Sequence, residues 1–182
     1  MDEVKSAPEL AEEGKRAYQD DKLNEAANLF AASAVAYERA GNLVDAAEMK
    51  NNQAVILLRL KQPEQALALI EGTPAIFSSA GDKHRYAMAL GNEGTALEDL
   101  RRYDEAVQRY QQSAELFDEL GEEQMRAMML ESITTINAKR GKLMDSYIAA
   151  VDGMAGVKKP TFRQRVLKWL MKVMSFFTRL WR

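Results

Sequence analysis

The chain has 182 residues, with 27 acidic and 25 basic side chains, one His and no Cys. The absence of Cys excludes disulfides, thiolate catalysis and thiolate-bound metals, and a single His leaves too few ligands for a zinc site. The charge is unevenly distributed, because residues 153–182 carry eight Lys or Arg and no acid, which leaves 17 basic (25 less 8) against 27 acidic side chains elsewhere. Such an asymmetry indicates a charged partner for the basic segment.

The N-terminal residues "MDEVKSAPEL" are acidic and lack the apolar stretch of a signal peptide. No run of roughly 18 uncharged apolar residues occurs, so we expect no membrane-spanning helix. These observations predict a cytoplasmic protein, free or attached to a membrane surface from outside the bilayer.

From residue 7 onward, apolar residues recur at spacings of three and four, which predicts amphipathic helices. The pattern repeats every 40 residues: Gly41, Gly81 and Gly121 align, as do Ala26, Ala66 and Ala106. A second helix of each repeat is predicted to begin at Leu23, Pro63, Tyr103 and Leu143.

One repeat contains a Pro where its second helix should continue. Pro74 follows Gly72 and Thr73, and Pro is not tolerated in a helix interior. We therefore predict a break near Gly72–Pro74, with Thr73 as the N-cap of a restarted helix.

Residues 89–122, "ALGNEGTALEDLRRYDEAVQRYQQSAELFDELGE", place Ala106 twelve residues after the small residue Gly94, and Tyr110 four residues further on. This arrangement resembles the tetratricopeptide repeat family, in a subclass with a longer period. The resemblance implies an all-α fold, a right-handed solenoid of helical hairpins over residues 7–154. Its four repeats would cover about 7–41, 42–81, 82–121 and 122–154.

The sequence carries no enzyme signature, and we expect no catalytic activity, cofactor or metal. His84 lies between Lys83 and Arg85 in an expected inter-repeat turn, where an exposed position is the simplest interpretation. The "GNEG" segment at residues 91–94 lacks the preceding strand of a phosphate-binding loop.

The resemblance also implies a concave groove, faced by the position two before the small residue of each repeat. Asn52 and Asn92 occupy that position, and Asn side chains offer both a donor and an acceptor to an extended peptide. The alternative is that both amides serve helix packing or water. Met88 and Asn92 stand where the family's carboxylate-binding pattern needs basic residues, which argues against recognition of a free C-terminus.

After an interruption at Gly153 and Gly156, residues 155–161 are predicted to form a linker and residues 162–182 a basic amphipathic helix. Thr161 and Gln164 fit a capping box. The residues expected to contact a membrane or partner are Phe162, Arg165, Val166, Lys168, Trp169, Leu170, Lys172, Val173, Phe176, Phe177, Arg179, Leu180 and Trp181.

Three roles remain open for this helix: attachment to an anionic membrane surface, capping or occupation of the chain's own groove, and binding of a partner or a second copy. We interpret the protein as a non-catalytic scaffold, adaptor or assembly factor with a protein or peptide partner. The alternative is a regulatory peptide-binding module whose C-terminal helix caps or occupies its own groove or mediates self-association. Nucleic acid is not expected as a partner, because the repeat region is anionic. The oligomeric state is left open.

Overall fold

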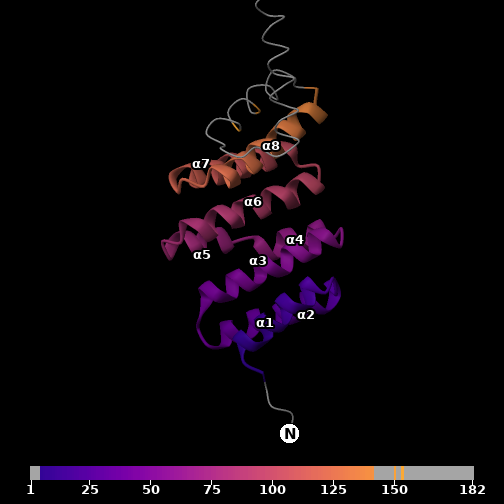
Figure 1. The fold of residues 1–182 in the computed structure, drawn as a ribbon, viewed down its shortest axis with the longest axis vertical. Coiled ribbons are helices and arrows are strands. Elements are labelled where there is room, and N and C mark those ends of the chain that lie inside the picture. Colours follow the sequence, from indigo (N-terminus) through magenta and orange to yellow (C-terminus); the bar gives the residue numbers. More distant parts are fainter. Residues whose placement is uncertain (1–4, 142–149, 151–152, 154–182) are drawn as a thin grey trace, which may run out of the picture. The chain divides into compact units, whose positions relative to one another are not determined.

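The computed structural model describes residues 5–141 together with Ala150 and Gly153, and all regular structure in these residues is α-helical. The helices are α1 (Ala7–Gln19), α2 (Leu23–Arg39), α3 (Leu43–Arg59), α4 (Pro63–Ile70), α5 (Thr73–Ser79), α6 (Lys83–Asp99), α7 (Tyr103–Glu119) and α8 (Glu123–Lys139) (Figure 1). The chain divides into two compact units, Met1–Arg109 and Tyr110–Arg182, with the boundary inside α7. The predicted start at Leu143, the linker and the helix 162–182 lie outside the described residues.

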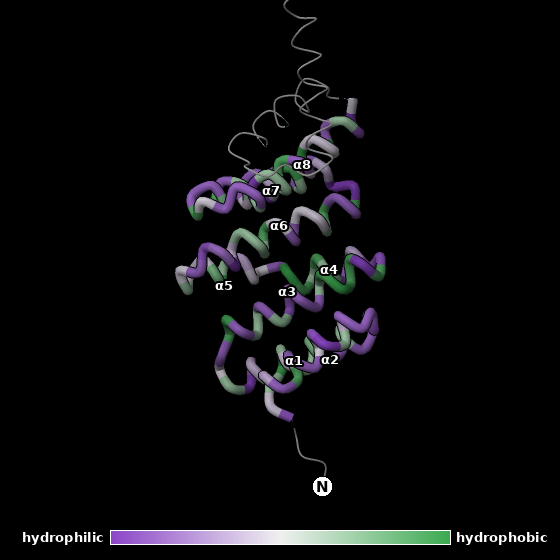
Figure 2. Tube along the Cα trace, in the orientation of Figure 1, coloured by the Kyte–Doolittle hydropathy of each residue, from purple (hydrophilic) through white to green (hydrophobic). Residues whose placement is uncertain are grey.

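Consecutive helices pack against each other in the first unit. The helix α2 lies against α1 and α3, α4 lies against α3, and α6 packs on α3, α4 and α5 (Figure 1). Leu23, Pro63 and Tyr103 begin α2, α4 and α7, so three of the predicted helix starts are confirmed. Short polar turns connect the helices, and α4 stands out as the most hydrophobic segment of this unit (Figure 2).

Small residues allow these helices to approach closely. Ala26, Ala66 and Ala106 each have 0% of their surface exposed, as expected from their 40-residue spacing. At Gly14 an added Cβ would lie 3.2 Å from the ring of Phe30, so the ring packs directly on the α1 backbone.

The predicted break in the second repeat is present, but its cap is a different residue. The helix α4 ends at Ile70, and α5 begins at Thr73 after Gly72, which has φ +87° and is the N-cap. The assignment of Thr73 as the cap is therefore wrong. Thr73 is the first residue of α5 and is 2% exposed, whereas glycine supplies the positive φ that turns the chain. The break leaves Phe77 of α5 buried between α3 and α6, against Ala47 and Ala89.

The second unit contains the end of α7, α8 and the residues that follow. The buried face of α8 is formed by Ala127, Leu130, Ile133 and Ile136. Gly153, expected to interrupt the repeat pattern, is helical and buried instead. An added Cβ there would lie 3.0 Å from Cβ of Leu130, so this glycine permits a close helix contact.

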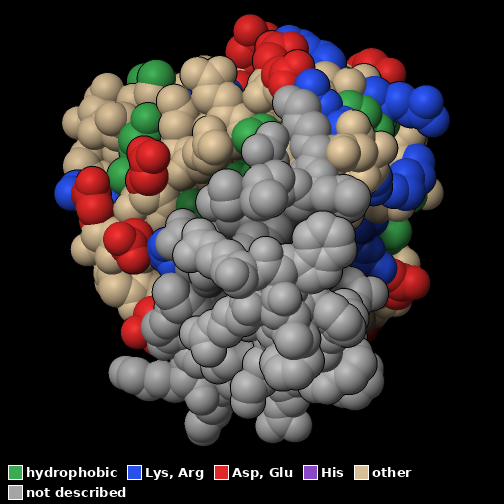
Figure 3. All heavy atoms as spheres, turned by 90° about the horizontal axis from the view of Figure 1, so that it is seen from above, with side chains coloured by type: hydrophobic (Ala, Val, Ile, Leu, Met, Phe, Trp, Pro, Cys, Tyr) green, Lys and Arg blue, Asp and Glu red, His purple; other side chains and the backbone are tan. Residues whose placement is uncertain are grey.

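Charged side chains are scattered over the face drawn in Figure 3. In Figure 3 acidic and basic groups lie around the margin of the visible face, and hydrophobic side chains form small separate patches. Exposed ion pairs such as Lys5–Glu13 and Lys15–Glu12 contribute little to stability.

The helices α1, α2, α3, α5, α6 and α7 are each followed by a residue in the left-handed conformation. Gly41 and Gly81, after α2 and α5, have φ near +75°. The residues after α1, α3 and α6 are not glycines: Asp21, Lys61 and Arg101 have φ near +60°. The amide of the next residue donates to the carbonyl five residues earlier, as Arg102 does to Leu97 at 2.9 Å. This Schellman arrangement favours glycine at the left-handed position.

Substitutions at two of these ends should have opposite effects on stability. Arg101→Gly should raise the free energy of unfolding by about 1 kcal/mol, because a side chain strains this backbone conformation. Gly81→Ala should lower it by about 1 kcal/mol, and no atom lies within 4 Å of the added Cβ, so only backbone strain contributes. Urea unfolding of both variants would measure the changes. Effects of the same sign would contradict this explanation of the helix ends.

Candidate functional site: a furrow between α3 and α6

Two hollows lie side by side along α3 and α6. The first is a cavity of about 360 Å³ lined by Glu48, Asn51, Asn52, Phe77, His84, Arg85, Met88 and Asn92. The second, of about 340 Å³, is lined by Val55, Leu58, Arg59, Lys61, Asn92, Thr95 and Asp99. Because Asn92 borders both, we describe them together as the α3/α6 furrow.

The furrow follows one stripe on each helix. Its α6 residues are Arg85, Met88, Asn92, Thr95 and Asp99, spaced by three and four residues as one face of a helix requires. Arg85 and Asp99 are fourteen positions apart, which corresponds to about 21 Å along the helix axis. Asn52 and Asn92, expected to face a groove, both line the furrow, and their role in binding stays a prediction.

A buried amide on α3 holds the furrow together. Asn51 is 8% exposed, and its Nδ2 donates to the Ala47 carbonyl at 3.1 Å and to Thr73 Oγ1 at 2.8 Å. Its Oδ1 accepts from Nδ2 of Asn92 at 3.4 Å. One side chain thus links α3 to the start of α5 and to the centre of α6.

These contacts fix which way the amides point. The Ala47 carbonyl only accepts, so Asn51 must present its Nδ2 there and its Oδ1 towards Asn92. Asn92 must therefore donate to Asn51, which leaves its Oδ1 and one N–H unused within the described residues. Asn52, half-buried, makes no hydrogen bond among these residues. Two Asn side chains consequently offer donors and acceptors to the furrow.

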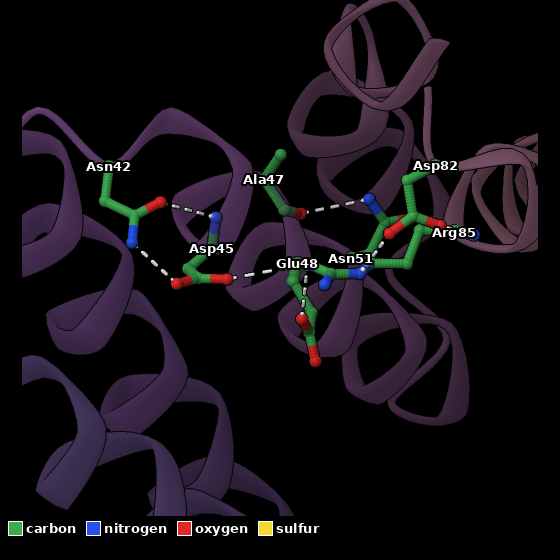
Figure 4. Close-up of polar contacts among 7 residues, drawn as sticks. All are labelled: Asn42, Asp45, Ala47, Glu48, Asn51, Asp82 and Arg85. Atoms are coloured by element: carbon green, nitrogen blue, oxygen red, sulfur yellow. Dashed lines mark hydrogen bonds and ion pairs between the residues drawn. The ribbon is translucent and has the colours of Figure 1, made fainter. Parts of the chain in front are cut away.

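A charged cluster closes one end of the furrow (Figure 4). Nη1 of Arg85 lies 3.0 Å from Glu48 and 3.5 Å from Asp45, and its Nε lies 2.9 Å from Asp82. Asn42 caps α3 by accepting from the Asp45 amide at 3.2 Å and also donates to the Asp45 carboxylate at 2.6 Å. Three carboxylates surround one guanidinium, so the cluster carries an excess of negative charge.

His84 lies in the first turn of α6 and not in a turn between helices, which corrects the expected location; it is exposed, as predicted. No group of three or more potential metal ligands occurs among the described residues. Within the same part of the chain, no helix has the length and apolar character needed to cross a membrane.

A third cavity, of about 300 Å³, lies where α4, α6 and the start of α7 meet. Glu93 lines it and pairs with Arg109 at 3.1 Å, and only 12% of its side chain is exposed. Burial raises the pKa of Glu93 above its ordinary 4.5, and Glu71 adds to the rise while Arg109 opposes it. In the same cavity, hydrogen bonds from Arg102 lower the pKa of Glu105.

The comparisons with known proteins agree with this architecture. Residues 45–119 match the family model described as Tetratricopeptide repeat. Residues 45–119 are therefore a tetratricopeptide-repeat region. No curated protein matches its sequence, so the remaining comparisons concern solved structures.

Three tetratricopeptide-like structures resemble the chain in fold. The apo form of RapI has a TM-score of 0.76 at 18% identity over 84% of this chain and 56% of that one. Aspartyl phosphate phosphatase F from Bacillus subtilis has a TM-score of 0.74 at 18% identity over 82% and 39%. A kinesin light chain with nearly identical repeats from Podospora anserina has a TM-score of 0.73 at 13% identity over 89% and 82%. The chain spans about half the length or less of the first two, and identities this low show the fold alone.

Sequence reasoning missed Asn51 and the cluster around Arg85. The "NN" at residues 51–52 was a signal, because adjacent residues on a helix point about 100° apart and one of the two had to face inward. Asp45 and Arg85 are 40 residues apart, which is the length of one repeat. The repeat period could therefore have indicated that they pair.

The two glutamates of the third cavity should respond oppositely to pH. The raised pKa of Glu93 means that its charge destabilises the fold, an effect absent below pH 4.5 and complete above the folded-state pKa. Glu93→Gln should therefore raise the free energy of unfolding at neutral pH, with the advantage vanishing as the pH falls towards 4.5.

Glu105→Gln is the matched control. The lowered pKa of Glu105 contributes stability above its ordinary pKa, and that contribution is lost as the pH falls through the folded-state pKa. This variant should be less stable than the parent protein at neutral pH and equal to it in acid. Urea unfolding across the pH range would measure both. A Glu93→Gln variant less stable at neutral pH would show that its pairing with Arg109 outweighs burial.

Proposed function

We propose that this protein is a non-catalytic interaction scaffold whose α3/α6 furrow binds an extended segment of a partner protein. The observation that carries the proposal is the pair of amides at its centre: Asn52 and the outward-facing half of Asn92. Each offers a donor and an acceptor, the combination that an extended backbone needs. A helical ligand satisfies its own backbone and would leave these amides unused.

The walls of the furrow support this role. Asn51 is held by three hydrogen bonds, so Asn92 is oriented before a ligand arrives. Preorganisation of this kind lowers the entropic cost of binding. The exposed side chain of Met88, 37% accessible, adds an adaptable apolar surface beside the amides.

We propose further that residues 162–182, outside the described residues, attach the scaffold to an anionic membrane surface. The support is the sequence: basic residues alternate with Trp, Phe and Leu at helical spacing, as in helices that lie in a membrane interface. The competing proposal is that this segment caps or occupies the chain's own furrow or joins two copies.

The furrow is tested by removing its amides. Peptides selected from a displayed random library with the full chain would be resynthesised, and their affinities measured by fluorescence polarisation. Asn52→Ala and Asn92→Ala together should weaken binding about tenfold or more, because each hydrogen bond is worth about 1 kcal/mol. Gln53→Ala on the same helix is the control, since Gln53 does not line the furrow. Equal affinity in all variants would refute the proposed site.

Attachment is tested by sedimentation with vesicles of phosphatidylcholine alone or with phosphatidylserine. The full chain should bind the anionic vesicles more strongly, Trp169→Glu should abolish binding, and Lys168→Glu should weaken it in a salt-dependent way. If the chain binds neither vesicle and Trp169→Glu instead lowers thermal stability, the segment is docked on the protein.

A further inference from the structure

The two ends of the α3/α6 furrow differ in chemistry, and this difference constrains the sequence of a bound segment. At the first end, Arg85 is the single guanidinium shared by three carboxylates, and Nη1 alone serves both Asp45 and Glu48. The nearby Lys15 is occupied by Glu12 at 2.7 Å.

Among the three carboxylates, Glu48 is the one whose negative charge is least balanced by its surroundings. Asp45 and Asp82 lie in the first turn and at the N-cap of their helices, where carboxylates balance the helix dipole. Glu48 lies further along α3, and it forms its ion pair with the Arg85 nitrogen that also serves Asp45. Lys15 acts on Glu48 only through space, because its direct contact is with Glu12. A carboxylate accepts several hydrogen bonds, so Glu48 retains room for a cation from a ligand. The aliphatic stem of that cation would lie on Met88, beside the buried ring of Phe77.

The second end is apolar and electrically balanced. Val55, Leu58 and Thr95 line it. The two cations at its rim are paired, Arg59 with Asp21 at 2.9 Å and Lys61 with Asp99 at 3.6 Å. An uncharged aliphatic side chain fits this hollow better than a charged one, because burial of a charge without a partner is costly.

Helix geometry gives the distance between the two ends. Ten residues separate Glu48 from Leu58 on α3 and Arg85 from Thr95 on α6, which corresponds to about 15 Å along each axis. In an extended chain, residues i and i+4 lie on the same face and about 13 Å apart. The backbone between them crosses Asn52 and Asn92, which lie four residues beyond Glu48 and Met88.

We propose that the furrow selects an extended segment in which a Lys or Arg lies four residues from a Leu, Ile or Val, with the basic side chain at Glu48 and the aliphatic one at Leu58. This inference rests on the proposed function and adds its sequence preference. The spacing is specific, since a shift of one residue turns one of the two side chains to the opposite face of the strand.

The test uses the full chain and capped Ser/Thr-rich dodecapeptides that contain Lys-x-x-x-Leu or Leu-x-x-x-Lys, measured by fluorescence polarisation. In one of the two orientations, affinity should fall at least tenfold when Lys is replaced by Glu, when Leu is replaced by Ser, or when the spacing is shortened by one residue. Glu48→Gln should remove most of the preference for Lys over Glu, and Glu25→Gln on α2, outside the furrow, should leave it unchanged.

The outcomes separate this inference from the proposed function. Binding that depends on Asn52 and Asn92 but ignores charge and spacing would overturn the inference and leave the peptide furrow intact. A preference for Glu over Lys would also overturn it. If none of these peptides and no peptide from the random library binds, the furrow itself is not a peptide site and both proposals fail.

Discussion

The buried amide of Asn51 is the interaction on which the furrow depends. It donates to the Thr73 hydroxyl at the start of α5 and accepts from Asn92 on α6, so it connects three helices through one side chain. A buried amide that lost these partners would cost about 1–3 kcal/mol. The same contacts that satisfy Asn51 also orient Asn92, so local stability and the shape of the site have a common cause.

The break between α4 and α5 places the hydroxyl of Thr73 where Asn51 can bind it. An uninterrupted helix would satisfy its own backbone, but Gly72 and Pro74 restart the chain and bring Thr73 into the interior at 2% exposure. Phe77 then fills the space between α3 and α6. Through Phe77, the irregular repeat therefore lines the acidic end of the furrow, where Arg85 pairs with three carboxylates.

Much of the fold follows from the sequence, because its determinants are local and periodic. The positions of small residues predicted the buried Ala26, Ala66 and Ala106, and the forbidden interior Pro predicted the break. Thr73 was assigned to the wrong role, since both Gly72 and Thr73 are acceptable caps and only the tertiary contact with Asn51 decides between them. Gly153 was expected only to interrupt the repeat pattern, and its close approach to Leu130 is a tertiary contact that the sequence alone does not show.

The candidate site was predictable only in part. Asn52 and Asn92 came from the repeat pattern, whereas the orientation of Asn92 depends on a hydrogen bond across two helices. The charge distribution of the furrow likewise depends on Arg85 meeting acids from α3 and from its own N-cap. Such contacts join residues up to 41 positions apart, and no local propensity encodes them.

Hydrogen exchange of the α5 amides in Asn51→Ala would test this account most directly, with Thr73→Val as a second variant that removes the hydroxyl alone. The account predicts faster exchange over Thr73–Ser79 in both variants, and in Asn51→Ala also weaker peptide binding, because Asn92 loses its orientation. Unchanged protection of α5 together with unchanged peptide affinity in Asn51→Ala would contradict it.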